Sequence, residues 1–114
     1  MSSKPKPLSE YRAMWLFAMF DLPVETREQR RDYSRFRKAL LNEGFSMLQY
    51  SVYARYCSCE DLAREYRARV AAYLPPSGQV RLLHVTDNQF GKMENYIGKN
   101  RAEAEQRPVQ LMLF

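Results

Sequence analysis

Cysteine and histidine are scarce in this chain of 114 residues, which has only Cys57, Cys59 and His84. Two cysteines cannot build a disulfide framework, and a bridge across one intervening residue would be strained in an extended segment, so we expect two free thiols. The three residues also fall short of the four ligands of a structural zinc site. No serine can be paired with a base, so nothing in the sequence supports a triad hydrolase.

Long hydrophobic runs are also absent. The longest, residues 13–20, is far shorter than the roughly 20 residues of a membrane-spanning helix. With Lys4, Lys6 and Arg12 before it, the run resembles a short signal peptide, but Asp21-Leu22-Pro23 follows where small residues would mark a cleavage site. We therefore expect no membrane association and a cytoplasmic location.

The composition is that of one folded domain. Hydrophobic residues make up 46% of the chain and charged residues 27%, which is enough to form a core and excludes a disordered chain. A core of this size is modest, and chains of this length often bury more surface by pairing with a second copy. Dimerisation is therefore an expectation from composition alone.

The chain divides into three parts. Residues 1–11 carry prolines and lysines without apolar periodicity, which predicts a flexible N-terminal tail. Residues 12–98 hold the regular patterns of one domain, and residues 99–114 form a C-terminal extension. Within the domain, residues 13–20 are apolar at every position, which predicts a central strand covered on both faces.

A helix follows this strand. Thr26 and Gln29 have the spacing of a capping box. Four apolar residues then recur at helical spacing until the glycine at position 44: Tyr33, Phe36, Leu40 and Leu41. Residues 45–57 are rich in β-branched and aromatic side chains, which predicts two short strands or one bent strand.

A second helix is predicted from residue 58 to the two prolines at positions 75 and 76. Its expected buried residues are Leu62, Tyr66, Val70 and Tyr73. Residues 80–86 read as a further strand, and a turn or short helix is expected over residues 87–93.

This order predicts an α+β, ferredoxin-like βαββαβ fold, in which an antiparallel sheet carries both helices on one face. Because the first strand is apolar on both sides, we expect a second copy to cover the other face, giving a two-fold homodimer. The C-terminal segment reads as an additional strand that docks on a sheet edge, of its own dimer or of a partner. Its apolar docking residues are Val109, Leu111, Leu113 and Phe114.

Positive charge is concentrated in the first helix. The chain has 18 basic and 13 acidic residues, a balance that favours a polyanionic partner, nucleic acid before an acidic membrane. At 100° per residue, four basic side chains fall within an arc of about 80° opposite the apolar face. This basic stripe, the candidate phosphate-binding surface, consists of Arg27, Arg31, Arg35 and Lys38. The alternative is an ordinary solvated face with ion pairs from Glu28 and Asp32.

Asp21 ends the apolar first strand. A carboxylate there caps a turn, pairs with a cation or holds a metal, and the cap is the commoner case. One carboxylate is too few for Mg²⁺-assisted phosphodiester cleavage, but a two-fold axis would add a second. A magnesium site shared by two copies of Asp21 is therefore a hypothesis.

Three tyrosines, Tyr50, Tyr53 and Tyr56, invite a comparison with RNA-binding sheets that stack bases on aromatic rings. The glycine-rich aromatic strand signature of that module is absent. We therefore interpret these tyrosines as packing residues.

Several strings together resemble the CRISPR-associated protein two family, the small non-integrase subunit of CRISPR spacer acquisition, in its type II form. The resemblance extends over residues 12 to 98 in order, and residues 110–114 add to it. The strings are residues 20–26, 33–38, 44–53, 80–81 and 83–89.

The resemblance implies a ferredoxin-like homodimer that binds duplex DNA and bridges two integrase dimers in a heterohexamer. It also implies a metal-dependent endonuclease, cleaving RNA or DNA, as the alternative activity. The family's metal-binding aspartate at the end of the first strand matches Asp21, with Mg²⁺ as the metal. Its basic residues on the first helix are carried over to the basic stripe as a set.

Overall fold

The computed structural model describes residues 12–98 and 100–101. The predicted N-terminal tail, residues 1–11, lies outside the described residues. So do the predicted docking residues Val109, Leu111, Leu113 and Phe114.

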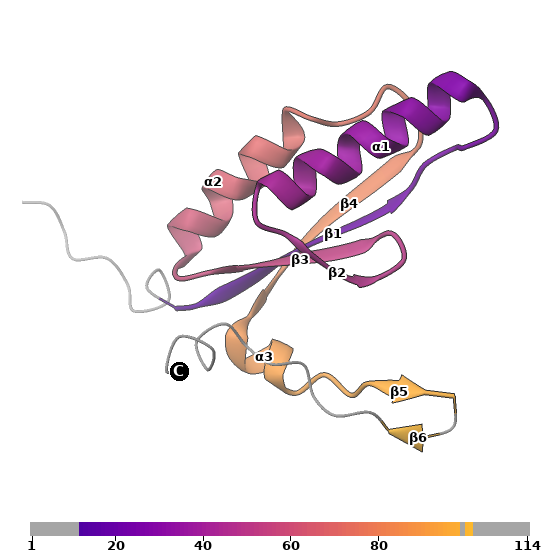
Figure 1. Cartoon of the computed structure of the whole chain (residues 1–114). Coiled ribbons are helices and arrows are strands. Elements are labelled where there is room, and N and C mark those ends of the chain that lie inside the picture. Colours follow the sequence, from indigo (N-terminus) through magenta and orange to yellow (C-terminus); the bar gives the residue numbers. More distant parts are fainter. Residues whose placement is uncertain (1–11, 99, 102–114) are drawn as a thin grey trace, which may run out of the picture.

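The described chain forms a four-stranded sheet, two long helices, one short helix and a small hairpin (Figure 1). The elements in order are β1 (Met14–Asp21), α1 (Arg27–Asn42), β2 (Ser46–Gln49), β3 (Val52–Cys57), α2 (Glu60–Ala71), β4 (Gln79–Thr86), α3 (Asp87–Gly91), β5 (Tyr96–Ile97) and β6 (Asn100–Arg101).

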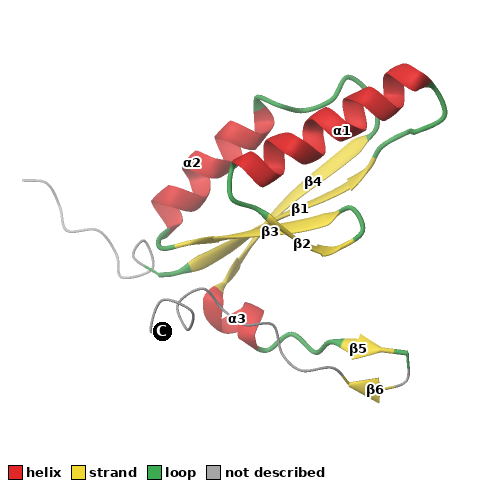
Figure 2. Ribbon diagram, in the orientation of Figure 1, coloured by secondary structure: helices red, strands yellow, loops and turns green. Residues whose placement is uncertain are grey.

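The sheet has the strand order β2-β3-β1-β4, and β1 pairs antiparallel with both neighbours. Both long helices lie in one layer over the same face (Figure 2). The predicted ferredoxin-like α+β fold is therefore confirmed, and the central strand expected over residues 13–20 is β1, Met14–Asp21.

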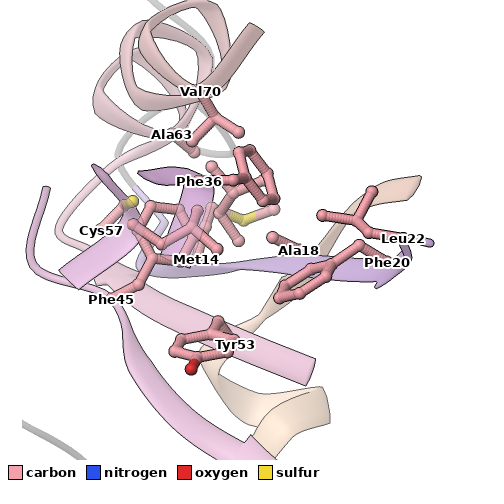
Figure 3. Close-up of a cluster of buried hydrophobic side chains, with 12 residues drawn as sticks. Met14, Ala18, Phe20, Leu22, Phe36, Phe45, Tyr53, Cys57, Ala63 and Val70 are labelled. Carbon is pink, nitrogen blue, oxygen red and sulfur yellow. The ribbon is translucent and has the colours of Figure 1, made fainter. Parts of the chain in front are cut away.

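Alternation along β1 separates two sets of side chains. Met14, Leu16, Ala18 and Phe20 join the main core with residues of both long helices. Figure 3 shows the centre of this core, where Phe36 of α1 and Ala63 and Val70 of α2 lie against the strand residues.

The opposite face, which we call the open sheet face, is covered only in part. Trp15 stacks on Phe90 of α3 with ring centroids 3.9 Å apart, and its indole Nε1 donates a hydrogen bond to Asp87 Oδ1 at 2.9 Å. Farther along this face, Phe17 and Met19 are half-buried and Leu83 is 49% exposed. The short helix α3 thus covers one end of the open sheet face and leaves apolar surface at the other.

The second helix is shorter than predicted. It ends at Ala71, and Tyr73 lies beyond it and is exposed, so its assignment to the buried stripe was wrong. Because the chain leaves the helix before Pro75 and Pro76, residue 73 no longer follows the helical spacing.

The described residues contain no disulfide, as expected: Cys57 is buried, and Cys59 is partly exposed. Burial raises the pKa of the Cys57 thiol above its ordinary value. No helix in the described ranges is long and apolar enough to span a membrane.

Candidate nucleic-acid interface

The start of α1 is fixed by local hydrogen bonds. Thr26 and Gln29 form the predicted capping box: Thr26 Oγ1 accepts from the Gln29 amide at 3.1 Å, and Gln29 Oε1 accepts from the Thr26 amide at 3.0 Å. Arg30 Nη1 donates to the carbonyls of Val24 and Glu25, which ties the helix to the preceding loop. These hydrogen bonds fix where the helix begins, and with it the positions of the basic residues along the helix.

The four residues of the basic stripe, Arg27, Arg31, Arg35 and Lys38, are all exposed on α1. Phe36 and Leu40, on the opposite face of the helix, are buried in the main core. Within residues 12–98, no ion pair involves any of the four. The alternative of a helix face neutralised by ion pairs from Glu28 and Asp32 therefore has no support in the geometry.

Two of the three arginines of α2 differ in this respect, whereas Arg67 has no ion pair among the described residues. Arg64 pairs with Asp61, and Arg69 pairs with both Glu43 and Glu65, at 3.3 and 3.0 Å. Hydrogen bonds to these two glutamates raise the pKa of Arg69. Uncompensated positive charge in the helix layer is therefore concentrated on α1.

A hollow of about 330 Å³ lies beside the basic stripe and is lined by Arg35, Lys38, Ala39, Asn42 and Tyr73. Tyr73, which lies beyond the end of α2, thus contributes an aromatic side chain to this hollow next to Arg35 and Lys38 of α1.

Two more cations of α1, Arg30 and Arg37, are exposed outside the stripe. At 100° per residue, they lie on the side of α1 between Tyr33 and the basic stripe. The basic stripe is defined by a narrow arc of the helix, so the sequence analysis left these two charges without a role.

Asp21 lies exposed at the end of β1, opposite Gln79 of β4. Its odd-numbered position places it on the open sheet face, with Trp15, Phe17 and Met19. Gly78 approaches closely: a Cβ there would lie 2.7 Å from the Asp21 carbonyl oxygen. The end of the strand is therefore held by a tight backbone contact.

The described part of the chain has no group of three or more His, Cys, Asp or Glu side chains arranged to hold a metal ion. Asp21 supplies a hard oxygen ligand suited to Mg²⁺, but one carboxylate is not a complete site. The ligand set of one copy therefore does not fit a magnesium ion, and the shared-site hypothesis requires a second copy.

His84 lies apart from Asp21. In β4 it stands opposite Leu16, whereas Asp21 stands opposite Gln79, a separation of roughly 16 Å along the strand. Burial lowers the pKa of His84, and the charge of Arg67 adds to this effect. His84 is therefore no partner for Asp21 in acid–base chemistry.

The three tyrosines have different environments. Tyr53 is 1% exposed in the main core, and Tyr56 is half-buried against Trp15. Both confirm the packing interpretation. Tyr50 is 77% exposed in the β2–β3 turn, so that interpretation was wrong for this residue. Tyr50 lies in the turn between β2 and β3, where Ser51 has a positive φ, and therefore belongs to neither strand.

Comparison with known proteins identifies the family. A family model described as CRISPR associated protein Cas2 matches residues 14–93. A relative from Parvibaculum lavamentivorans, named CRISPR-associated endoribonuclease Cas2, is 50% identical over 101 residues, which cover 89% of this chain and 100% of that protein.

Two further relatives have the same name. The protein from Flavobacterium psychrophilum is 43% identical over 94% of this chain and 93% of its own length. The protein from Paracidovorax avenae is 39% identical over 94% of this chain and 99% of its own length. With the family model and these relatives all extending over most of the fold, the chain belongs to the CRISPR-associated protein Cas2 family.

Proposed function

We propose that this protein is the DNA-binding platform of CRISPR adaptation: a homodimer that holds duplex DNA on its basic stripes and bridges two integrase dimers. The observation that carries the proposal is the basic stripe, in which Arg27, Arg31, Arg35 and Lys38 are exposed on one helix and lack ion pairs in the described structure. Such a surface contacts phosphates and reads no bases, which suits a platform that accepts duplexes of any sequence.

The open sheet face supports the dimer. Phe17, Met19, Leu83 and Met93 line an apolar hollow of about 330 Å³ on this face. A second copy that packs sheet against sheet about a two-fold axis would cover it. In this arrangement the α1 helices of both copies stay outside the interface, so the two basic stripes remain available to one duplex.

The DNA-binding part is tested by salt dependence. Each phosphate contact contributes about 0.9 to the slope of log K against log salt concentration. We expect the double variant Arg31→Ala/Arg35→Ala to bind duplex DNA more weakly whatever its sequence, with a slope reduced by about 2. Fluorescence anisotropy at several salt concentrations measures this slope.

The matched control is Arg64→Ala/Arg69→Ala, which removes two arginines whose charges are compensated by ion pairs on α2. Its slope should stay near that of the unchanged protein. Equal slopes for all three proteins would show that the basic stripe does not contact the duplex.

The adaptation role is tested with the partner integrase. Integration of a duplex should collapse when this protein is omitted, and Asp21→Ala should leave integration intact because a platform needs no metal ligand. Integration that is equally efficient without this protein would overturn the proposal.

A second candidate function is metal-dependent phosphodiester cleavage, favoured by the endoribonuclease name of the relatives and by the place of Asp21 on the open sheet face. A dimer formed through this face would bring two copies of Asp21 to one interface. A bound Mg²⁺ would supply charge stabilisation at the scissile phosphate and an activated water.

Cleavage of RNA and of DNA by the purified protein, with Mg²⁺ or with a chelator, tests this second function. We expect Asp21→Asn to abolish cleavage while the dimer and DNA binding persist. Cleavage that is unchanged in Asp21→Asn would rule out this carboxylate as a metal ligand.

A further inference from the structure

A pocket of about 260 Å³ lies between α2 and β4 and shares no residue with the basic stripe or with the hollow of the open sheet face. Its volume falls below the roughly 300–1,000 Å³ of sites for drug-sized ligands, so the pocket suits a small group. Four of its side chains can carry charge. The lining consists of Met14, Glu60, Ala63, Arg64, Arg67 and His84.

The pocket lies on the flank of α2 that is turned away from α1. Arg69, on the other flank, pairs with Glu43 at the end of α1. At 100° per residue, Arg67 is about 160° from Arg69 around the helix. His84 stands opposite Leu16 in the register, so it faces the helix layer from β4, an outer strand of the sheet. The pocket is therefore separate from the proposed DNA-binding surface.

His84 has a ring nitrogen without a protein partner. Its Nε2 is the one buried side-chain nitrogen or oxygen that lacks a hydrogen bond among the described residues. Buried polar atoms are nearly always hydrogen-bonded, so this atom calls for a partner from outside the chain, a water molecule or a ligand. A hydrogen bond with the Ala63 backbone favours the protonated ring, and with Nε2 unpaired its donor is Nδ1. Nε2 therefore becomes a donor when the ring takes up a proton.

The charges around His84 favour an anion. From α2, two guanidinium groups and one carboxylate face it, those of Arg64, Arg67 and Glu60, whereas β1 presents apolar side chains. Arg64 pairs with Asp61, but Arg67 has no ion pair among the described residues. The planar donors of a guanidinium group match the oxygens of a phosphate.

We propose that this pocket binds the phosphate group of a small molecule, inorganic phosphate or a phosphomonoester, between His84, Arg64 and Arg67. A phosphate oxygen accepts a hydrogen bond from Nε2 of the protonated ring, and the guanidinium groups hold the other oxygens. Binding of the anion is therefore coupled to the uptake of one proton by His84. The site does not depend on the proposed function.

His84 is the only histidine of the chain, so its imidazole signal in a proton NMR spectrum reports on the pocket directly. Burial, with the charge of Arg67 adding to it, lowers the pKa of His84 in the free protein. We expect saturating sulfate, which stays doubly charged throughout the titration, to raise this pKa. Chloride at matched ionic strength should leave the pKa near its starting value.

The same coupling sets the pH dependence of the affinity. Between the pKa of the free protein and that of the complex, the affinity for sulfate should rise by up to about tenfold for each pH unit of acidification. His84→Gln, which keeps a polar side chain but has no charge to gain, should lose this dependence. Isothermal titration calorimetry of the full chain measures these affinities.

Arg67→Gln should weaken the binding of sulfate and of inorganic phosphate about tenfold, the effect of one lost charge-assisted hydrogen bond. The matched control is Arg69→Gln, which removes the same charge from the other flank, where it is paired with Glu43 and Glu65. This control should bind like the unchanged protein. Equal losses in both variants would overturn the proposal, because they would show attraction to net charge alone.

Inorganic phosphate, a nucleoside 5′-monophosphate and the parent nucleoside distinguish the sources of the phosphate group. Tighter binding of the monophosphate than of inorganic phosphate would support a nucleotide site, and equal affinities would support a site for phosphate itself. Binding of the nucleoside as tightly as its monophosphate would overturn the proposal. So would a titration of His84 that sulfate and chloride change equally, which would leave a water molecule as the partner of Nε2.

Discussion

At Gly78, any side chain would collide with the end of β1. It has φ of +94°, and a Cβ there would lie 2.7 Å from both the Asp21 carbonyl oxygen and Leu22 Cδ2. We expect Gly78→Ala to lower the free energy of unfolding by about 1–2 kcal/mol through the left-handed backbone alone, with the clash adding to this loss. Urea denaturation measures the change.

Gly98→Ala is the matched control, because Gly98 also has a positive φ, of 64°, but a Cβ there would meet nothing within 4 Å. It should show the conformational cost without the clash. Equal losses in both variants would mean that the contact between Gly78 and the end of β1 relaxes freely.

His84 makes stability depend on pH. Burial lowers its pKa below the ordinary value of 6.5, with Arg67 adding to the shift and the Ala63 backbone and Glu60 opposing it. Between the lowered pKa and 6.5, the unfolded chain binds a proton that the folded chain does not. The free energy of unfolding should therefore fall as the pH decreases through 6.5 and level off below the folded pKa.

The measurement is urea unfolding at several pH values for the unchanged protein and for His84→Gln, which has no charge to gain. The difference between the two profiles isolates His84 from the carboxylates. Parallel profiles between pH 7.5 and 5.5 would contradict the prediction.

For single residues, the sequence predicted those contacts in which both partners lie a few positions apart in the chain. Thr26 and Gln29 are three residues apart, so their capping box could be recognised by spacing alone. Tyr50 could not be assigned in this way. Its exposure depends on the left-handed backbone of Ser51, and an ordinary serine gives no sign of that conformation.

At the scale of elements, α3 packs on β1 through the ring of Phe90, which contacts both Trp15 and Phe17. Phe90 is buried and stacks on Trp15 at 3.9 Å with planes inclined by 9°. We expect Phe90→Ala to reduce the free energy of unfolding by about 3–5 kcal/mol, the usual cost of truncating a buried phenylalanine. Amide hydrogen exchange should accelerate in α3 and remain slow in α1.

Val24→Ala, which truncates an exposed side chain in the loop before α1, serves as the control and should have little effect. A loss below about 1 kcal/mol for Phe90→Ala would show that α3 is held by other contacts. The hydrogen bond from the Asp87 amide to the Ala13 carbonyl, at 2.9 Å, would be the first to consider.

The boundaries of an element were predicted more accurately where its ends carry clear capping residues. The first helix has a capping box and ends before a glycine with positive φ, and its extent was predicted closely. The second helix has Cys59 as its N-cap without a side-chain hydrogen bond, and it was predicted to begin at residue 58 and to bury Tyr73. The hairpin of β5 and β6 was not foreseen, because residues 94–101 carry no alternating apolar pattern.

At the scale of the whole molecule, the open sheet face predicts self-association. Leu83 is 49% exposed in the middle of this face, opposite Phe17. We expect sedimentation of the unchanged protein to show a concentration-dependent dimer, and Leu83→Lys to raise its dissociation constant at least about tenfold by placing a charge in an apolar contact.

Leu74→Lys is a matched control, since Leu74 is also 49% exposed but lies in the loop between α2 and β4. It should dimerise like the unchanged protein. A monomer at every concentration would remove both the dimer and the shared metal hypothesis, whereas the fold would stand.

The alternation of β1 has a consequence for how this family can vary. Even-numbered residues of the strand face the helices, and odd-numbered residues, Asp21 included, face the other side. Deleting or inserting one residue within the strand would exchange the two sets and turn the aspartate toward the hydrocarbon interior. Insertions and deletions should therefore accumulate in the surrounding loops. Within the strand itself, they should occur only two residues at a time, because this preserves the alternation.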